Sequence, residues 1–231
     1  DGRIVRADGV EGVLPNDGRL CVKGRFGYDY VHSPERLTVP LIKERGSFRE
    51  ATWDEALDAA AAGFLCIKDR YGPDALAGYA SAKCTNEDNY LFQKLVRIAF
   101  GTNNLDYCTR LCHASTVTAM LKALGDGAAT NSIEDYERAG CVLVIGNNMI
   151  ETHPVSATYL KRGLRRGGRL VVIDPRWTPL GALADVWLQP RLGTDVALLN
   201  GMARVAIEEG WIDEDFIARR VSGGLESLET L

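Results

Sequence analysis

Two runs of purely apolar residues, 141–145 and 170–173, constrain the fold of this chain more than any other feature. Continuous apolar runs of this length are typical of strands that are buried on both faces of a sheet. The residues between them, 155–166, have the pattern of a helix and end in a group of cationic side chains, which suit the negative end of a helix dipole. Region 141–174 is therefore predicted to be a strand–helix–strand unit with parallel strands and a right-handed crossover.

Other segments extend this pattern. A third strand is predicted at 186–188, and a short strand at 76–80 precedes a predicted helix over 89–100. Thr52 and Glu55 have the spacing of a capping box at the start of a further helix. Strands that alternate with helices favour parallel sheets. We therefore predict an α/β fold, a three-layer αβα arrangement built from Rossmann-like strand–helix–strand units.

Three regions are expected along the chain. Residues 1–20 alternate apolar and polar side chains between turn-forming pairs, which predicts short strands. These residues are assigned to a small strand-rich region, 1–45. Residues 46–110 are predicted to form the first half of an αβα domain, and 111–231 a truncated αβα domain that contains the parallel sheet.

The bulk composition excludes several classes of function. The 231 residues carry a net charge of −4 with scattered basic side chains, so nucleic acid is not an expected partner. No apolar run approaches the length of a membrane span. The six cysteines are irregularly spaced, which argues against a disulfide framework and favours a reducing compartment. The chain begins without Met inside a strand-like pattern, and we expect it to be a fragment.

The densest group of reactive side chains lies in the stretch 106–115. There Cys112 and His113 are adjacent, which puts a sulfur that binds soft metals or acts as a nucleophile beside a group that titrates near neutral pH. The alternative is a buried cysteine beside a partly exposed histidine. A zinc site is not favoured, because a second ligand pair at recognisable spacing is missing. A cysteine–histidine hydrolase stays open, although His32 and His153 lie far along the chain.

Three polar loops follow the predicted strands, at 146–154, 174–180 and 190–195. In open α/β sheets, ligands bind beyond the carboxyl ends of the strands. Acidic side chains in these loops could accept hydrogen bonds from a ribose or a guanine, and glycines let backbone N–H groups approach a phosphate. The residues concerned are Glu151, Asp174, Asp195, Gly146 and Gly193. No G-x-G-x-x-G follows a strand, so an NAD-type site is not supported. The alternative is that the acidic loop residues merely cap the following helices, as Thr194 and Asp195 would.

Taken together, these motifs resemble those of the catalytic (alpha) subunits of molybdenum- or tungsten-dependent formate dehydrogenases, in the molybdopterin oxidoreductase superfamily. Segment 18–25 is similar to the one that carries the last cysteine of the family's [4Fe-4S] cluster. The resemblance implies that Cys21 is a cluster ligand and that Lys23 lies between cluster and pterin. Cys112 and His113 are similar to the pair in which the cysteine ligates the metal and the histidine serves in acid–base chemistry and positioning. This pair discriminates best, because the related nitrate reductases usually lack the histidine.

The resemblance also implies which residues bind the cofactor. Segment 83–87 resembles that of the cytosolic NAD-coupled members, and the three loops resemble those that bind the pterin guanine dinucleotides. Region 1–45 would then be part of the [4Fe-4S]-binding region, and 111–231 the molybdopterin-binding domain. The implied cofactor-binding residues are Lys23, Lys83, Cys84, Asn86, Gly146, Asn147, Glu151, Thr152, His153, Asp174, Pro175, Arg176, Gly193, Thr194 and Asp195.

The reaction that the resemblance implies is the reversible oxidation of formate to carbon dioxide at a molybdenum or tungsten bis-molybdopterin guanine dinucleotide centre. Thiolate ligands suit such a soft metal site. Electrons would pass through the pterin and Lys23 to the cluster, and then to NAD by way of flavin- and iron–sulfur-containing partner subunits. A cytoplasmic location is expected, with no nucleic acid or membrane as partner.

Two departures from the family pattern bear on activity. The cluster needs four cysteines, of which this chain supplies only Cys21, and the family's substrate-binding arginine would lie beyond Leu231. The chain alone is therefore expected to be inactive without the remainder of the catalytic subunit. Two alternatives stay open: another molybdopterin oxidoreductase of the nitrate reductase type, and a cofactor-free, non-catalytic fragment or subunit.

Overall fold

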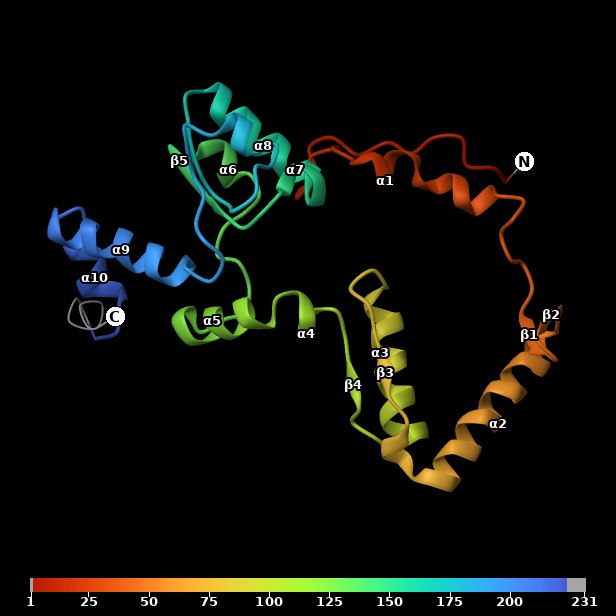
Figure 1. The fold of residues 1–231 in the computed structure, drawn as a ribbon. Helices are drawn as coiled ribbons and strands as arrows, with labels where there is room; N and C mark the ends of the chain where they lie inside the picture. The colour runs from red at the N-terminus through yellow and green to blue at the C-terminus, as the bar shows by residue number, and fades with distance from the viewer. Residues whose placement is uncertain (1, 224–231) are drawn as a thin grey trace. The chain divides into compact units, whose positions relative to one another are not determined.

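The structure of the chain is a computed structural model that describes residues 2–223. It divides into two compact units, which are described separately. The first unit comprises Tyr28–Thr130 with the first three residues of the chain, and the second comprises Ile4–Gly27 and Asn131–Leu231. Figure 1 labels their helices and strands.

The domain limits inferred from the sequence, at residues 45 and 110, stay predictions. Asp1 and residues 224–231, which belong to the predicted first and third regions, lie outside the described residues. No helix within residues 2–223 combines the length and the apolar character that crossing a lipid bilayer requires.

The first unit is mainly helical, with two small sheets (Figure 1). The hairpin β1–β2 is antiparallel, whereas β3 and β4 are parallel. Its elements in chain order are η1 (Gly27–His32), β1 (Leu41–Glu44), β2 (Ser47–Glu50), α2 (Trp53–Tyr71), η2 (Pro73–Ala75), β3 (Gly78–Tyr79), α3 (Asn86–Lys94), η3 (Leu95–Phe100), β4 (Leu105–Asp106), α4 (Thr109–Cys112) and α5 (Ala114–Leu124).

Helix starts in the first unit follow capping chemistry. The hydroxyl of Thr52 accepts a hydrogen bond from the backbone N–H of Glu55, as the sequence predicts for the start of α2. Helix α3 has a complete capping box, in which Thr85 and Asp88 exchange side-chain and backbone hydrogen bonds. Because of this box, α3 begins at Asn86, earlier than the predicted residue 89.

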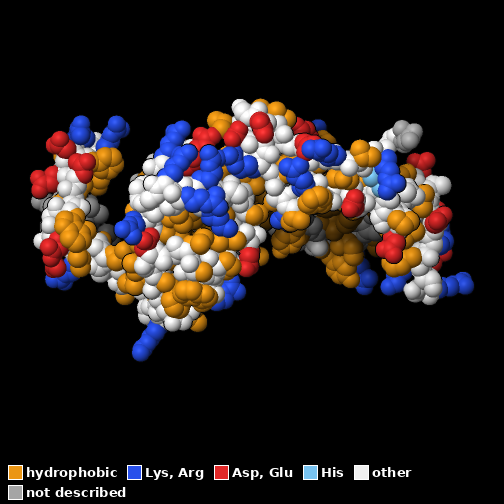
Figure 2. Space-filling model, turned by 90° about the horizontal axis from the view of Figure 1, so that it is seen from above, with side chains coloured by type: hydrophobic (Ala, Val, Ile, Leu, Met, Phe, Trp, Pro, Cys, Tyr) orange, Lys and Arg blue, Asp and Glu red, His pale blue; other side chains and the backbone are white. Residues whose placement is uncertain are grey.

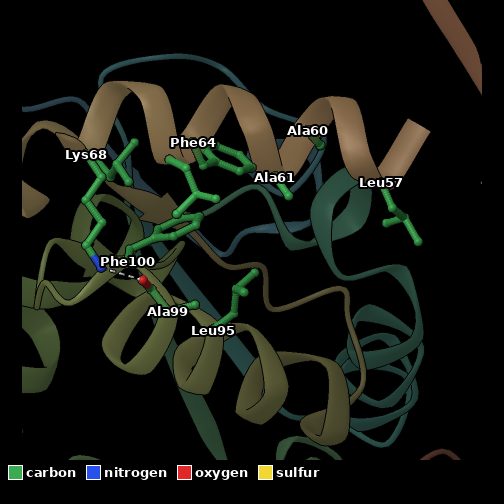
Figure 3. A pocket seen from close by; sticks show the side chains of 10 residues that line it. Leu57, Ala60, Ala61, Phe64, Lys68, Leu95, Ala99 and Phe100 are labelled. Atoms are coloured by element: carbon green, nitrogen blue, oxygen red, sulfur yellow. Dashed lines mark hydrogen bonds between the residues drawn. The ribbon is translucent and has the colours of Figure 1, made fainter. Parts of the chain in front are cut away.

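The core of the first unit is small. Leu76, Val96 and Phe100 are buried, and Phe92 and Leu105 pack against them. Beside this core, α2 and the segment η3 enclose an apolar groove, shown in Figure 3. In the groove the rings of Phe64 and Phe100 lie 4.8 Å apart between centroids. At one end, the Lys68 ammonium donates a hydrogen bond to the carbonyl of Ala99, 2.8 Å away, which ties α2 to η3.

The second unit contains the three-stranded parallel sheet β5–β6–β7. The prediction of a mixed α/β fold with parallel sheets is therefore confirmed. Its elements in chain order are α1 (Val22–Phe26), α6 (Asp135–Arg138), β5 (Cys141–Ile145), α7 (Met149–Thr152), α8 (Pro154–Arg165), β6 (Arg169–Ile173), η4 (Gly181–Leu183), β7 (Val186–Leu188), α9 (Asp195–Glu208) and α10 (Glu214–Arg220).

Helix α8 builds the core of this unit against the sheet. Ala157 and Leu160 of the helix are buried together with Leu170 and Val172 of β6 and Val144 of β5. The spacing of the helical pair follows the three- and four-residue repeat that brings side chains to one helix face. The predicted strand–helix–strand unit is thus present, with its apolar runs as the two paired strands.

Helix α6 lies against α8 at close range. A Cβ added to Gly163 of α8 would lie 2.7 Å from the carbonyl oxygen of Tyr136, so only glycine fits this crossing without a shift. Glu137, whose side chain is 10% exposed, forms ion pairs with Arg162 at 3.1 Å and Arg166 at 2.6 Å. The cationic end of α8 is therefore used to hold α6 in place.

Two expectations about strands were wrong. Residues 2–20 contain turns but no strand, and backbone hydrogen bonds there close local turns, such as that from Asp17 N–H to the Val13 carbonyl at 2.9 Å. A strand needs a partner to complete its ladder. Strand β5 is not buried on both faces either, since Leu143 is 44% and Ile145 37% exposed while the alternate residue Val144 is buried.

Large apolar side chains lie at the surface of both units. Figure 2 shows such side chains in orange between the charged ones on the face in view. In the first unit, Tyr79 and Ile98 are among the most exposed, and in the second unit Leu192 and Trp211 are. Exposed apolar area of this extent is typical of surfaces that contact other protein segments.

Candidate functional site

The carboxyl end of the sheet in the second unit is the first candidate region. The backbone N–H of Gly146 donates to the carbonyl of Ile173 at 2.9 Å, and that of Asp174 donates to the carbonyl of Leu188 at 3.1 Å. These bonds continue the ladders just past the last strand residues. The loops that follow β5, β6 and β7 therefore all leave the sheet at the carboxyl ends of its strands, as predicted from the sequence.

Asp174 is the most buried of the predicted loop residues, at 8% exposure. Its carboxylate accepts a hydrogen bond from the backbone N–H of Arg176 at 2.8 Å, and its carbonyl accepts one from the indole N–H of Trp187 at 3.1 Å. The carbonyl of Pro175 accepts a bond from the Gln189 side chain at 2.8 Å. The turn after β6 is thus fixed by its own side chains and by the next strand, with the Arg176 side chain left exposed.

The loop after β5 leads into the short helix α7. Asn147, Glu151 and His153 are exposed there. The hydroxyl of Thr152 donates to the carbonyl of Asn148 at 3.0 Å and lies 3.0 Å from Nδ1 of His153. The structure therefore gathers these predicted residues on one turn at the sheet edge.

Two residues of these loops were not singled out from the sequence. The side-chain oxygens of Asn148 and Thr178 are buried, and within the described residues neither has a hydrogen-bond partner. A buried polar atom without a partner is costly and calls for an explanation such as a ligand or an ion. No sequence signal could have identified them, because burial and missing partners depend on the folded chain.

The third predicted loop leads into α9. Gly193 has a positive φ of 81°, a conformation that favours glycine. The hydroxyl of Thr194 donates to the carbonyl of Arg191 at 2.7 Å and does not cap the helix through its side chain. Asp195 is exposed in the first turn of α9. The alternative reading of Thr194 as a side-chain cap is therefore wrong.

Cys21 and Lys23 lie in the same unit as these loops. Cys21 is the residue before the first turn of α1, which contains Lys23. The backbone N–H groups of Gly24 and then Lys23 lie near the sulfur and lower the pKa of the Cys21 thiol, although Cys21 makes no side-chain capping hydrogen bond to α1. A lowered thiol pKa favours the thiolate, the form that binds metals. The local structure thus fits a cysteine that acts as a metal ligand.

The first unit holds the remaining predicted residues. Cys112 ends α4, and His113 links α4 to α5 with a non-helical backbone, φ −149° and ψ 29°. Both side chains are exposed. Strand β4, which precedes this stretch, runs parallel to β3, which precedes the loop with Lys83, Cys84 and Asn86. Because parallel strands point the same way, both stretches leave the same end of the small sheet.

The loop after β3 is held by a residue that the sequence did not reveal. The Asn89 side-chain amide donates to the carbonyls of Ser81 and Thr85, each at 3.0 Å, and its oxygen accepts from the Ser81 N–H at 3.3 Å. Lys83 and Cys84 are therefore presented on a fixed turn. Within residues 2–223, no three His, Cys, Asp or Glu side chains gather as a metal-binding group.

Comparison with known proteins identifies the family. The pattern of the molybdopterin oxidoreductase family matches residues 36–219, most of the chain. The chain belongs to the molybdopterin oxidoreductase family. This membership supports a molybdopterin cofactor.

Among curated molybdopterin oxidoreductase relatives, an F420-dependent formate dehydrogenase subunit alpha of Methanocaldococcus jannaschii is 45% identical over 228 residues. That match covers 96% of this chain and 33% of the relative. A probable oxidoreductase of Bacillus subtilis, YjgC, is 43% identical, with 99% of this chain and 23% of the relative covered. The chain thus spans about a third or less of the length of these relatives.

A solved structure is also similar. Acetylene hydratase from Pelobacter acetylenicus superposes with a TM-score of 0.70 at 29% sequence identity. The match covers 94% of this chain and 29% of the hydratase. Since this relative is named for a different reaction, family membership by itself does not identify the substrate.

Proposed function

We propose that the chain is part of the catalytic subunit of a formate dehydrogenase. The observation that carries the proposal is the 45% identity, over almost the whole chain, to a formate dehydrogenase alpha subunit. The adjacent Cys112 and His113 at the end of the β3–β4 sheet support it further, because this pair resembles the metal-ligand and histidine pair of formate dehydrogenases.

The proposed reaction removes two electrons and one proton from formate and leaves carbon dioxide. A molybdenum or tungsten ion held by two molybdopterin guanine dinucleotides would accept the two electrons. Cys112 would supply the protein's thiolate ligand, and its exposed position at the end of α4 leaves the sulfur accessible. His113, equally exposed, would hold the formate anion when cationic or accept its proton when neutral.

The loops at the sheet edges would hold the dinucleotides. In the second unit, backbone N–H groups near Gly146 and Gly193 suit phosphates, and exposed Arg176 suits an anion. The unpartnered oxygens of Asn148 and Thr178 fit a polar ligand that the protein alone does not satisfy. The other residues proposed to bind the cofactor are Lys23, Lys83, Cys84, Asn86, Asn147, Glu151, Thr152, His153, Asp174, Pro175, Thr194 and Asp195.

Cys21 is proposed to ligate a [4Fe-4S] cluster, with Lys23 between cluster and pterin. The lowered pKa of the Cys21 thiol supports ligation, and such a cluster takes three further cysteine ligands. NAD, reached through flavin- and iron–sulfur-containing subunits, stays the predicted acceptor. The names of the methanogen relatives make F420 a second candidate. The cytoplasmic location also stays a prediction.

The test is a formate-oxidation assay of the purified gene product with a viologen dye as acceptor, together with analysis for molybdenum, tungsten and iron. Cys112→Ala should abolish activity, because the metal loses its protein ligand. Cys66→Ala is the matched control, since Cys66 is another exposed cysteine that lies on α2 and outside the site. Activity of the Cys112 variant at the level of the control would overturn the proposal.

Two further results would also contradict it. Nitrate reduction without formate oxidation would favour the nitrate reductase alternative. A stable gene product without molybdenum, tungsten or pterin would favour the non-catalytic alternative. Comparison of NAD with F420 as natural acceptor then decides the electron partner.

A further inference from the structure

One arginine links the segment before Cys21 to the sheet-bearing part of the second unit. A guanidinium nitrogen of Arg19, Nη1, donates to a carboxylate oxygen of Asp17 at 2.7 Å and to the hydroxyl of Tyr159 at 3.0 Å. The guanidinium carbon also lies 4.6 Å from the centroid of the Tyr159 ring. Tyr159 is 3% exposed and belongs to α8, the helix that packs on the sheet. Arg19 therefore bridges two segments 140 residues apart in sequence.

The backbone around Arg19 is held as tightly as its side chain. The Arg19 N–H donates to the carbonyl of Asn16 at 2.9 Å, and the Asn16 side-chain amide returns a bond to the Arg19 carbonyl at 2.8 Å. The other carboxylate oxygen of Asp17 accepts the N–H of Gly12 at 2.8 Å. Asp17 thus connects the turn to Arg19, and Arg19 connects it to α8.

A second arginine fixes the chain on the other side of Cys21. Arg25, in the last turn of α1, pairs with Asp8 at 2.7 Å and donates to the carbonyl of Ala7 at 3.4 Å. This anchor reaches only the neighbouring N-terminal segment. Of these two arginines, Arg19 reaches the helix packed on the sheet, through its contact with Tyr159.

We propose that Arg19 is a positioning residue for Cys21. By holding Tyr159 and Asp17, it fixes the turn from which the Cys21 sulfur is presented, and so orients a cluster ligand relative to α8 and the sheet. The inference rests on the proposed function, in which Cys21 binds iron. Residues that contact a metal ligand and orient it typically strengthen metal binding, and their removal lowers metal affinity by about 10- to 100-fold.

The first experiment compares amide hydrogen exchange in the wild-type chain, Arg19→Ala and Tyr159→Phe. The amides of residues 20–26 should exchange faster in Arg19→Ala, and to a smaller degree in Tyr159→Phe, which keeps the buried ring. Arg36→Ala is the matched control, because Arg36 stacks on Tyr30 at 5.3 Å in the first unit. Unchanged exchange of residues 20–26 in Arg19→Ala would overturn the inference, whether or not iron is bound.

The second experiment uses the iron-loaded gene product and follows iron loss to a chelator, the electron paramagnetic resonance spectrum of the reduced cluster and its midpoint potential. Arg19→Ala should lose iron about tenfold faster and show an altered spectrum or potential. Arg19→Lys should be intermediate, since an ammonium keeps the charge but lacks the planar guanidinium that lies against the Tyr159 ring. An unchanged spectrum, potential and rate of iron loss in Arg19→Ala, or equal changes in Arg36→Ala, would contradict the proposal.

These experiments separate the two proposals. A wild-type gene product that never binds iron would reject the cluster role of Cys21, and hydrogen exchange would still decide whether Arg19 fixes the turn. A wild type that holds iron, with an Arg19→Ala variant that behaves identically, would reject the role of Arg19 alone.

Discussion

Tyr79 and Asp106 are direct partners across the parallel strands β3 and β4. The N–H of Ala80 continues this ladder with a bond to the carbonyl of Asp106 at 3.0 Å. The two strands therefore deliver the chain to the same end of the sheet, one into the loop with Lys83 and the other into the stretch with Cys112. Two segments that the sequence treats as separate motifs become neighbours through this single pairing.

Replacement of Gly78, the residue before Tyr79 in β3, should destabilise this sheet. A Cβ at Gly78 would lie 2.7 Å from a methyl group of Val96 and 2.9 Å from the ring of Phe92. Val96 is fully buried and cannot move without disturbing the core. Gly78→Ala is expected to lower the free energy of unfolding by about 1–3 kcal/mol, measured by urea denaturation.

Gly63→Ala is the control for this prediction. Gly63 lies inside α2, and a Cβ there meets no atom within 4 Å. Alanine is the better helix former, so this change should raise the free energy of unfolding by about 0.5–1 kcal/mol. Changes of the same sign and size at both glycines would show that the contacts of Gly78 are not the cause.

Truncation of Leu160 should cost the second unit much of its stability. Its side chain is fully buried between α8 and the sheet. Leu160→Ala leaves a cavity and is expected to cost about 2–5 kcal/mol in the free energy of unfolding. Leu192→Ala, at a residue that is 86% exposed, should change it by less than about 0.5 kcal/mol. A small loss at Leu160 would mean that this helix face does not carry the core.

The sheet of the second unit was predictable because its signal is local. Apolar runs mark β5 and β6, and the helical repeat of α8 lies between them, so strand order and direction follow from short stretches of sequence. The burial of β5 was not predictable in the same way. Its open face depends on which segments cover the sheet, and an apolar run cannot distinguish a covered strand from one with an exposed side.

The sequence showed which reactive and polar residues follow the strands of the candidate site. It did not show which side chains contact one another there. Asp174 and Cys112 could be singled out because their chemistry is visible in the sequence. The contact of Arg19 with Tyr159 and the unpartnered oxygen of Asn148 could not, because both depend on packing between distant segments. In the sequence, nothing distinguishes Arg19 from an ordinary surface arginine, because its partner Tyr159 lies 140 residues away.

Asp185 should make the stability of the second unit depend on pH. Its carboxylate accepts a hydrogen bond from the backbone N–H of Leu170 at 2.8 Å and pairs with Arg169, and these contacts lower the pKa of Asp185. A lowered pKa means that the stabilisation is fully present above the unfolded value of about 3.9 and is lost as pH falls through the folded value.

Asp185→Asn should therefore lower the urea midpoint at neutral pH, and its difference from wild type should disappear in acid below that window. Asp215→Asn is the control, because Asp215 is 92% exposed and its pairing with Arg219 is long, at 4.0 Å. A difference for Asp185→Asn that stays constant down to low pH would show that the charge of the carboxylate is not responsible.

The thiol of Cys21 should titrate below the range of an ordinary cysteine in the metal-free chain. Its pKa is lowered because the nearby backbone N–H groups of Gly24 and Lys23 favour the thiolate. The rate of alkylation by iodoacetamide, followed for the Cys21 peptide by mass spectrometry, should reach half its maximum at a lower pH in the folded chain than in urea. In urea these N–H groups no longer converge on the sulfur, so the midpoint should rise to the ordinary value. Equal midpoints in the folded and the unfolded chain would mean that the first turn of α1 does not stabilise the thiolate, and would remove the local support for Cys21 as a preformed metal ligand.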